Sequence, residues 1–587
     1  MAKTTTEKKE KLISALSLWR SYDVTGELNA ELFEPRVDET TGLTYTPLTY
    51  DGRAAEDGRV RIFAYYARPK GDKKCPAILL LKEAGKPFDV ELMWYFVQRG
   101  YAVLMPDYSG EFACGEAVVK SEETAAEYTV YPASLGYANY EKAQGMYDVE
   151  GISSDKTCWY EWTYVALYSL EYLTTLKDVD KLGVVGVRTG GEVAWKVMLS
   201  SDVACGVPIN AAGWLSVNGA GKFAELSAIN MTEERHRYIA AVDSQSYAPF
   251  VKCPVLMLCA LSDHAFDADR AYDTYVRIGG EKGNDGSAIV YSADSGSCIG
   301  QGGLTDMEMF LEKHLKGREV FIPAALNVTV KENGGALRVE VSADREALLE
   351  EIGICYAEAD GRVKSAYREW QCVHKATATE IKDGKTECSI TPYAGPSMAF
   401  VYAYAKCLNG FKVVSKIVGK PCGAAARAEG SRMLFSGDDL DCFSVSRHED
   451  YSVAGIFLEK EATPKLVAGY GNFYGAYSLG GIKTYKIGSP RYVAKDGAML
   501  KFDAYSRLGG TLSVGVETTD ERGGVERYFC LIPVKAGGKW KRIILEAKDF
   551  KNETYGRPLP SFSSGSALAF QSEREQDEIV VTNVLWL

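Results

Sequence analysis

Short apolar runs alternate with helical patterns over the first half of the chain. Between residues 181 and 199, an apolar run at 182–187 breaks at a glycine-rich turn, and apolar residues then recur at helical spacing up to Met198. This order predicts a buried parallel strand that leads directly into an amphipathic helix. The alternation continues to about residue 318 and predicts a parallel sheet covered by helices on both faces.

The same pattern predicts the other elements of this α/β part. Strand-like runs occupy residues 60–69, 75–85, 100–110, 203–213, 254–260 and 287–292. Helical periods occupy residues 157–176 and 307–316, and a further helix is expected from residue 269. Residues 1–35 are predicted to be an N-terminal helical lead-in that packs on the α/β domain, which is expected to span 36–318.

From residue 321 the helical period disappears and short alternating strands take its place. Residues 319–422 predict a β-sandwich of roughly 100 residues, a size usual for immunoglobulin-like domains. A glycine- and alanine-rich linker at 423–430 precedes a second all-β block at 431–587. The predicted fold class is therefore multidomain, with an α/β domain followed by two all-β sandwich domains.

The turn after the 182–187 run has the glycine spacing of the nucleophile elbow, G-x-S-x-G. Gly186, Gly190 and Gly191 lie where small residues let a strained turn pack closely. The central position, where serine belongs, is Arg188. A guanidinium has no accessible deprotonated form, so it cannot attack an acyl carbon at neutral pH. Thr189 is adjacent, but its side chain is expected to point elsewhere, and a role as replacement nucleophile is the less favoured interpretation.

This α/β part resembles the acetyl xylan esterase and cephalosporin deacetylase branch of the α/β hydrolases. The resemblance rests on the motifs GYAVLMPD at 100–107, a tryptophan-rich helix from Trp159, KLGVVGVRTGG at 181–191 and PVLMLCALSD at 254–263. It implies an α/β-hydrolase fold and a catalytic triad in the chain order Ser, Asp, His.

Two of the three triad positions are altered. Asp263 matches the acid position, but residues 294–301, where the base is expected, contain no histidine. Cys298 lies near the base position, and a buried structural thiol is favoured over a nucleophile that has no base partner. His264 is interpreted as a solvated loop residue. Because loss of the serine or the histidine alone costs on the order of a millionfold in such a triad, ordinary esterase activity is not expected.

Two roles for Arg188 remain open. The guanidinium could pair with Asp263, the carboxylate left without its histidine. Alternatively, Arg188 and Thr189 beside the N-terminus of the following helix, with Lys82 nearby, could bind a carboxylate or phosphate, such as a uronate. Lys82 belongs to the Lys-Glu-Ala-Gly sequence that replaces the His-Gly often found in the family's oxyanion loop.

The C-terminal block resembles jelly-roll modules of the galactose-binding type, including family-eleven carbohydrate-binding modules. The resemblance rests on Lys539-Trp540, Asp549-Phe550 and the terminal residues 583–586. A glycine-rich stretch in this block contains four aromatic residues, Tyr470, Phe473, Tyr474 and Tyr477. These rings either stack on sugars or fill the space between the two sheets.

Composition excludes several classes of partner. The formal net charge of −12 argues against nucleic acid, which needs a basic surface. The chain has no run of 18 apolar residues and no signal-peptide pattern, so no membrane partner is expected and a cytoplasmic location is predicted. Fourteen cysteines lack metal-site or disulfide spacing, and no cofactor or metal is predicted.

The predicted function is that of an esterase-like homologue without serine-hydrolase catalysis, which binds an oligosaccharide or small carboxylate or serves in assembly. The alternative is an active carbohydrate esterase with a non-standard nucleophile or base. A third interpretation is a self-associating protein in which the β-domains make the protein contacts.

Overall fold

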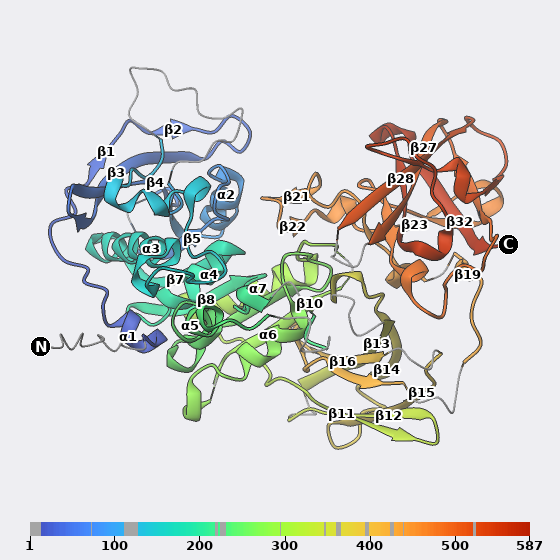
Figure 1. Ribbon diagram of the computed structural model, residues 1–587, viewed down its shortest axis with the longest axis horizontal. Helices are drawn as coiled ribbons and strands as arrows, with labels where there is room; N and C mark the ends of the chain where they lie inside the picture. Colours follow the sequence, from blue (N-terminus) through green and yellow to red (C-terminus); the bar gives the residue numbers. More distant parts are fainter. Residues whose placement is uncertain are drawn as a thin grey trace, which may run out of the picture.

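The computed structural model describes residues 13–587 with several internal gaps. The residues outside the description are 72, 111–126, 218–220, 224–229, 284, 294, 345–347, 360–364, 394–397, 423–427, 438 and 520–523. Most of the predicted linker at 423–430 and one residue of the predicted base loop, 294, therefore lie outside the described residues. Figure 1 shows an α/β part followed by two β-rich parts.

The α/β part is built on a ten-stranded sheet. Its main path runs, in spatial order, through β1 (Glu31–Leu32), β3 (Thr44–Ala55), β4 (Gly58–Ala67), β6 (Ala102–Pro106), β5 (Cys75–Leu81), β7 (Val179–Val187), β8 (Val203–Ile209), β9 (Leu256–Ala260) and β10 (Ala288–Ser292), and β2 (Arg36–Val37) pairs with β3. The strands from β6 to β10 along this path run parallel, as predicted.

The first strands correct the prediction of a purely parallel sheet. β3 pairs with β4 and β4 with β6 in antiparallel register, so the sheet is mixed. The reason is local: only Glu56 and Asp57 separate β3 from β4, and so short a connection can join only antiparallel strands. Within the described part of residues 13–35, the chain forms one short helix, α1 (Ala15–Trp19), and then strand β1.

Helices cover both faces of the sheet. One apolar core includes residues of α3 (Cys158–Thr175), α4 (Thr189–Val197), α5 (Glu233–Ala241) and α6 (Ala268–Tyr275). The core on the other face includes residues of α2 (Val90–Gln98) and α7 (Gln301–Lys316). α3 coincides with the helix predicted for residues 157–176, but it is buried on nearly all sides and not on one face, with Trp159 and Trp162 almost fully buried. No helix among the described residues is long and apolar enough to cross a membrane.

The middle part consists of two antiparallel sheets. The three-stranded sheet has the order β11 (Asn327–Asn333), β12 (Ala336–Ser342) and β15 (Lys385–Ile390); the five-stranded sheet has the order β14 (Gln371–Thr377), β13 (Leu349–Ala359), β16 (Met398–Cys407) and β17 (Lys412–Val414), with β18 (Val418–Pro421) also on β16. Cys355 and Phe400 belong to the same apolar core as Met257 of β9, so the middle part packs directly on the α/β part.

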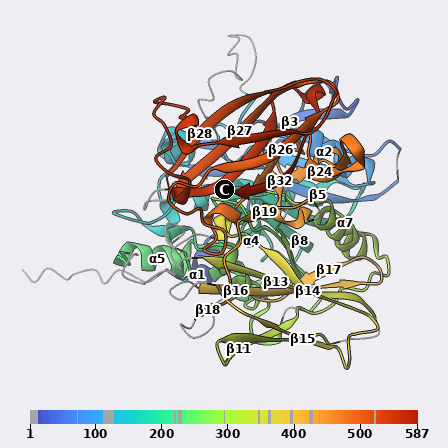
Figure 2. The same ribbon diagram turned by 90° about the vertical axis from the view of Figure 1, so that its right-hand side faces the viewer.

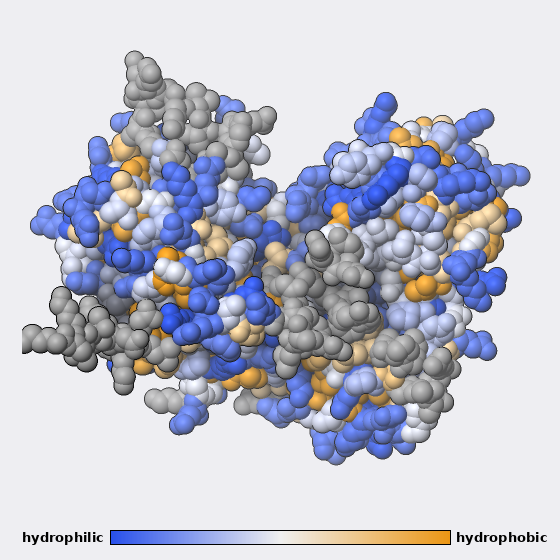
Figure 3. All heavy atoms as spheres, viewed as in Figure 1, coloured by the Kyte–Doolittle hydropathy of each residue, from blue (hydrophilic) through white to orange (hydrophobic). Residues whose placement is uncertain are grey.

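The C-terminal part has two six-stranded antiparallel sheets. One contains β23 (Lys465–Ala468), β24 (Tyr474–Tyr477), β32 (Ile579–Trp586), β26 (Leu500–Ser506), β29 (Lys541–Leu545) and β19 (Met433–Phe435). The other contains β20 (Ser444–Val445), β25 (Ile482–Thr484), β31 (Gly565–Ser572), β27 (Gly510–Thr519), β28 (Val525–Val534) and β30 (Lys551–Asn552). A small hairpin, β21 (Ser452–Val453) and β22 (Phe457–Leu458), extends from this part toward the α/β part (Figure 1). In the space-filling view a notch separates the two parts at the edge of the molecule (Figure 3).

A buried carboxyl at the contact between α7 and β17 predicts a pH effect on stability. Asp306 accepts a hydrogen bond from the backbone N–H of Lys412 at 3.0 Å, and burial raises the pKa of Asp306 to about 7. The folded state therefore holds this proton between about pH 4 and pH 7, whereas the unfolded chain releases it, so the free energy of unfolding falls as pH rises through this window.

Asp306→Asn should remove that cost, because asparagine keeps the acceptor oxygen and carries no charge. We expect a gain near zero at pH 4 that grows to about 1–4 kcal/mol above pH 7, since one pKa unit corresponds to about 1.4 kcal/mol. Urea denaturation at a series of pH values measures it, with Asp496→Asn at an exposed position as the control. A gain that does not change with pH would contradict the argument.

Candidate functional site

The site is organised around the sharp turn between β7 and α4. Arg188 joins the two elements with φ 46° and ψ −112°, a conformation that non-glycine residues rarely adopt. Its backbone N–H donates to the carbonyl of Ile209 on β8 at 2.8 Å, and its carbonyl accepts from Glu192 at 2.9 Å. A residue held in a strained strand-to-helix turn at the carboxyl edge of the sheet is the geometry of a nucleophile elbow.

The three glycines of the motif are required by close packing. A Cβ on Gly186 would lie 2.4 Å from the carbonyl oxygen of Gly190, and one on Gly190 would lie 2.1 Å from the carbonyl oxygen of Leu81. A Cβ on Gly191 would lie 2.5 Å from the Cβ of Ala211. The structure thus retains the close backbone approach that the elbow needs while the residue at its tip is an arginine.

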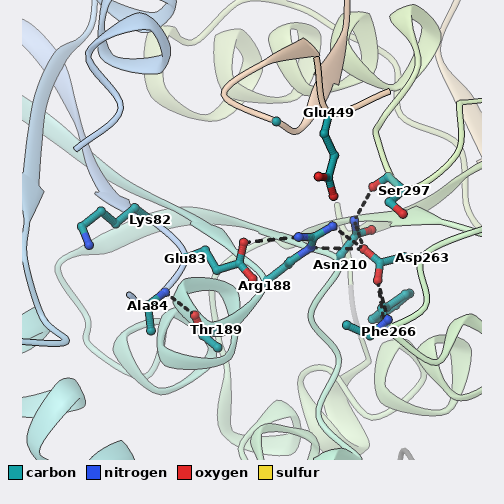
Figure 4. A network of polar contacts seen from close by, with 12 residues as sticks. Lys82, Glu83, Ala84, Arg188, Thr189, Asn210, Asp263, Phe266, Ser297 and Glu449 are labelled. Atoms are coloured by element: carbon teal, nitrogen blue, oxygen red, sulfur yellow. Dashed lines mark hydrogen bonds and ion pairs between the residues drawn. The ribbon is translucent and has the colours of Figure 1, made fainter. Parts of the chain in front are cut away.

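The Arg188 guanidinium pairs with two carboxylates (Figure 4). Its Nε and Nη2 donate to Oδ2 of Asp263 at 3.2 Å and 3.1 Å, and its Nη1 donates to Oε2 of Glu83 at 3.3 Å. Burial opposes the positive charge, but the carboxylates of Asp263 and Glu83 outweigh it, and the pKa of Arg188 is raised above its ordinary value. The structure therefore brings together Arg188 and Asp263, as the pairing interpretation expects.

Asp263 is almost completely buried and uses both of its oxygens in hydrogen bonds. Oδ2 accepts from Arg188 and, at 3.1 Å, from the Nδ2 of Asn210. Oδ1 accepts from the backbone N–H groups of Ala265 at 2.8 Å and Phe266 at 3.2 Å. In a catalytic triad this carboxylate would hold a histidine in place, whereas here it holds the arginine.

Asn210 is a member of the site that the sequence pattern does not identify. It follows β8 with φ 49°, and its Nδ2 also donates to the carbonyl of Ser297 at 3.1 Å. Its Oδ1 accepts from the backbone N–H of Ala260 at 2.7 Å. Its position in the sequence could have identified it, because Asn210 directly follows an apolar strand and so lies at the carboxyl edge of the sheet, where ligands of open α/β sheets bind.

Thr189 is tied to the loop after β5 and does not face Arg188. Its Oγ1 accepts from the backbone N–H of Ala84 at 2.6 Å and shares a hydrogen bond of 3.0 Å with the hydroxyl of Tyr108. In α/β hydrolases an N–H group from this loop helps to bind the oxyanion. Here the Ala84 N–H donates to Thr189, so this candidate oxyanion donor is already in use.

Lys82 and Arg188 do not converge on one pocket. The Lys82 Nζ lies 3.4 Å from Oδ1 of Asp107 and donates to the carbonyl of Lys86 at 2.6 Å. Figure 4 shows it pointing away from the guanidinium. Burial lowers the pKa of Lys82, and its side chain is only 5% exposed, which leaves little of it for a ligand from solvent.

The C-terminal hairpin packs on the loop where the catalytic base was expected. The N–H of Ile299 donates to the carbonyl of Ile456 at 2.6 Å, and the N–H of Leu458 donates back to the carbonyl of Ile299 at 3.0 Å. The side-chain amide of Gln301 donates to the Leu458 carbonyl at 2.6 Å. The backbone of the base loop therefore pairs with a segment that lies more than a hundred residues further along the chain.

Cys298 lies beneath this hairpin. Its Sγ is within 3.7 Å of the carbonyl of His448 and 3.6 Å of that of Gly455, and the residue is fully buried. Burial raises the pKa of the Cys298 thiol to about 11. A protonated thiol that donates to backbone carbonyls serves packing and is a poor nucleophile.

The segment just before the hairpin places His448 next to the base loop, which has no histidine of its own in the sequence. A Cβ on Gly296 would lie 2.8 Å from Nδ1 of His448, so the imidazole lies against this loop. Burial lowers the pKa of His448, and its Nε2 has no hydrogen-bond partner among the described residues. His264 is instead exposed, and its ring packs 4.7 Å from that of Tyr367.

The surroundings of Arg188 are acidic overall. Asp263 and Glu83 already oppose its single positive charge, and Glu449 directs a third carboxylate toward the same place (Figure 4). An anionic ligand is drawn to a net positive pocket, and this group of side chains does not provide one. No group of three or more candidate ligand side chains for a metal is found within the described residues.

The four aromatic residues of the glycine-rich stretch divide into two kinds. Tyr470, Phe473 and Tyr474 are 48%, 69% and 54% exposed, respectively, whereas Tyr477 is only 7% exposed. The exposed three, which we call the aromatic patch, lie in and beside the turn between β23 and β24. The indole N–H of Trp540 donates to the carbonyl of Tyr470 at 3.0 Å and supports the turn.

The mixed sheet and the elbow give the N-terminal part an α/β-hydrolase fold. No protein-family model matches the chain, and no curated protein matches it. Among solved structures, an acetyl xylan esterase from Paenibacillus sp. R4 is 17% identical, with a TM-score of 0.37 over 51% of this chain and 92% of the other. Acetyl xylan esterase 1 from Thermoanaerobacterium sp. JW/SL YS485 is 18% identical, with a TM-score of 0.35 over 51% of this chain and 90% of the other. An acylaminoacyl peptidase from Pyrococcus horikoshii is 15% identical, with a TM-score of 0.34 over 50% of this chain and 43% of the other.

Proposed function

We propose that this chain is an esterase-like α/β-hydrolase homologue that has lost serine-hydrolase catalysis and acts in carbohydrate-related binding or assembly. The observation that carries the proposal is the Arg188 guanidinium at the nucleophile position, paired with the carboxylate that would orient a catalytic base. We also infer that the middle part is an immunoglobulin-like sandwich and the C-terminal part a jelly roll of the galactose-binding type. Their pairs of antiparallel sheets support this inference.

Acyl transfer needs a nucleophile that can lose a proton and a base that can accept it. Arg188 can serve neither as the nucleophile nor as the base, because the two carboxylates raise its pKa further and keep the guanidinium protonated. Thr189 accepts a hydrogen bond from Ala84 instead of facing a base, and the Cys298 thiol is buried and protonated. Thr189 at the elbow and Cys298 in the base loop thus each make structural contacts.

Hydrolysis of p-nitrophenyl acetate tests the loss of catalysis. We expect the protein to give no turnover above that of buffer, and Arg188→Ser to give none either, because Asp263 holds no imidazole in place. Arg338→Ser, at an exposed position on the middle part, is the matched control for loss of an arginine. Turnover by the natural chain that disappears in Asp263→Ala would overturn the proposal.

One observation favours the second candidate, an active hydrolase with a non-standard base. His448 lies against Gly296, in the loop that carries the base in the esterases. Burial lowers the pKa of His448 and so keeps its imidazole neutral. If Arg188→Ser gained esterase activity that His448→Ala then removed, the imidazole would be within catalytic reach of the elbow. The nucleophile of the natural chain would still have to be found.

The aromatic patch is our candidate for the carbohydrate contact. Aromatic rings that are half exposed or more and held in a turn present flat apolar faces, whereas a buried ring such as Tyr477 fills the core. The patch lies on the C-terminal part, whereas Arg188 lies in the α/β part. A neutral oligosaccharide suits such rings and does not require the positive charge that a uronate would.

Binding to a panel of neutral and uronate-containing oligosaccharides tests this assignment. Phe473→Ala and Tyr474→Ala should each weaken binding of a neutral ligand at least tenfold, or by about 1.4 kcal/mol. Tyr555→Ala removes an equally exposed ring (76% exposed) outside the patch and should leave binding unchanged. If no sugar binds and the patch variants instead dissociate an oligomer in light scattering, the rings serve self-association.

A further inference from the structure

The middle part contains two cysteines that face each other across neighbouring strands. β13 and β14 are antiparallel, and Cys355 is directly opposite Cys372 in their register. A β-bulge between Ile354 and Cys355 sets this alignment. Directly opposite residues in antiparallel strands have Cα atoms about 4.5–5.5 Å apart, which lies within the range of about 4.4–6.8 Å that a disulfide bridges.

The two sulfurs are free thiols that already interact. The contact with the Cys355 thiol lowers the pKa of Cys372, with a further contribution from the positive charge of Lys375, and the Cys372 Sγ also lies 3.5 Å from the carbonyl oxygen of His374. The same contact and burial raise the pKa of Cys355. Cys372 therefore loses its proton more readily than Cys355, which favours Cys372 as the attacking sulfur.

Access to the pair comes from one side. β14 is the edge strand of its sheet, and Cys372 on it is partly exposed, whereas Cys355 on the inner strand β13 is 6% exposed. Figures 1 and 2 show β13 and β14 side by side in the middle part, between the outer sheet of β11, β12 and β15 and the rest of the molecule. An oxidant from solvent would thus meet Cys372 first, with Cys355 directly behind it.

We propose that Cys355 and Cys372 are a redox-sensitive pair that forms a reversible cross-strand disulfide with a low-molecular-weight disulfide as oxidant. The Cys372 thiolate attacks one sulfur of the oxidant, breaks its S–S bond and releases one small thiolate, which takes up a proton. Cys355 then loses its proton as it attacks the Cys372 sulfur and displaces the second small thiol. The two protein thiols are oxidised by two electrons, and the small disulfide is reduced to two thiols.

The cross-link would act on a strand that connects the parts of the molecule. The residue before Cys372, Gln371, donates its side-chain amide to the hydroxyl of Tyr492 in the C-terminal part at 3.0 Å. Trp370 packs edge-on against Tyr402 of β16, 4.8 Å between ring centres. Oxidation would hold the start of β14 on β13 and so restrain the strand that makes this contact.

The experiment uses the full-length protein treated with oxidised glutathione, alkylated under native conditions and digested without reductant for mass spectrometry. We expect a Cys355–Cys372 peptide pair two hydrogen atoms lighter than the reduced peptides, which dithiothreitol reverses. In Cys355→Ser the pair is lost and Cys372 carries glutathione, and in Cys372→Ser Cys355 stays reduced. Cys388→Ser is the matched control because Cys388, on β15, is near enough to Cys372 for the charge of Cys372 to raise the pKa of Cys388, and this variant should retain the pair.

Two results would overturn the proposal: a Cys372–Cys388 link in place of the expected one, or full alkylation of Cys355 and Cys372 after the oxidant. Circular dichroism melting checks that each serine variant is folded. If Cys355→Ser does not fold because its site is buried, Cys355→Ala provides the same readout.

Discussion

Arg368→Met should destabilise the folded chain by about 3–5 kcal/mol, because it leaves a buried carboxylate without its cation. The Arg368 Nη1 lies 2.6 Å from Oδ1 of Asp269, and neither side chain has any exposed surface. The guanidinium also lies 3.5 Å from the centre of the Phe400 ring. Arg368 belongs to the middle part and Asp269 to α6, so the pair joins the middle part to the α/β part. Urea denaturation at pH 7, followed by tryptophan fluorescence, measures the loss.

An exposed ion pair of the same length is the control. Arg338 lies 2.6 Å from Glu387, with side chains 49% and 60% exposed, and Arg338→Met should cost no more than about 1 kcal/mol. The double variant Arg368→Met with Asp269→Leu should recover much of the loss, because an apolar pair leaves no charge buried. A loss below 1 kcal/mol in Arg368→Met alone would show that water or another group compensates Asp269.

The hydrophobic pattern correctly predicted several strands and helices of the α/β part. The run at 182–187 and the helical spacing after it correspond to β7 and α4, and the helical period at 157–176 corresponds to α3. The apolar spacing predicts the type of each element, although α3 and α4 are buried on nearly every side and not on one face alone. The same pattern does not report which strand an element pairs with, and so it did not reveal the antiparallel start of the sheet.

The elbow could be located from the sequence because close packing within the turn requires glycine at fixed positions, and these glycines form a local motif. Arg188 and Asp263 could be assigned to the site because each follows an apolar strand. The packing of the hairpin and of the preceding His448 on the base loop could not be found in this way. Its contacts join residues more than a hundred positions apart, and no local pattern encodes them. Glu83 and Asn210 were missed for a related reason, since the pattern of a loop does not show which of its polar side chains turn inward.

Gly190→Ala should be the most damaging single methyl addition at the elbow. The new Cβ would lie 2.1 Å from the carbonyl oxygen of Leu81 and 2.4 Å from that of Lys82. Both obstacles are backbone atoms at the end of β5, which cannot move without disturbing the central sheet. We expect a loss of about 3 kcal/mol or more in the free energy of unfolding, at or above the upper end of ordinary overpacking. Urea denaturation measures it.

Gly136→Ala is the matched control because a Cβ at Gly136 meets no atom within 4 Å. We expect that variant to stay within about 0.5 kcal/mol of the natural chain. A small loss in Gly190→Ala would mean that α4 can move away from β5. In that case Arg188 would also be free to leave Asp263, and the argument that the arginine closes the nucleophile position would fail with it.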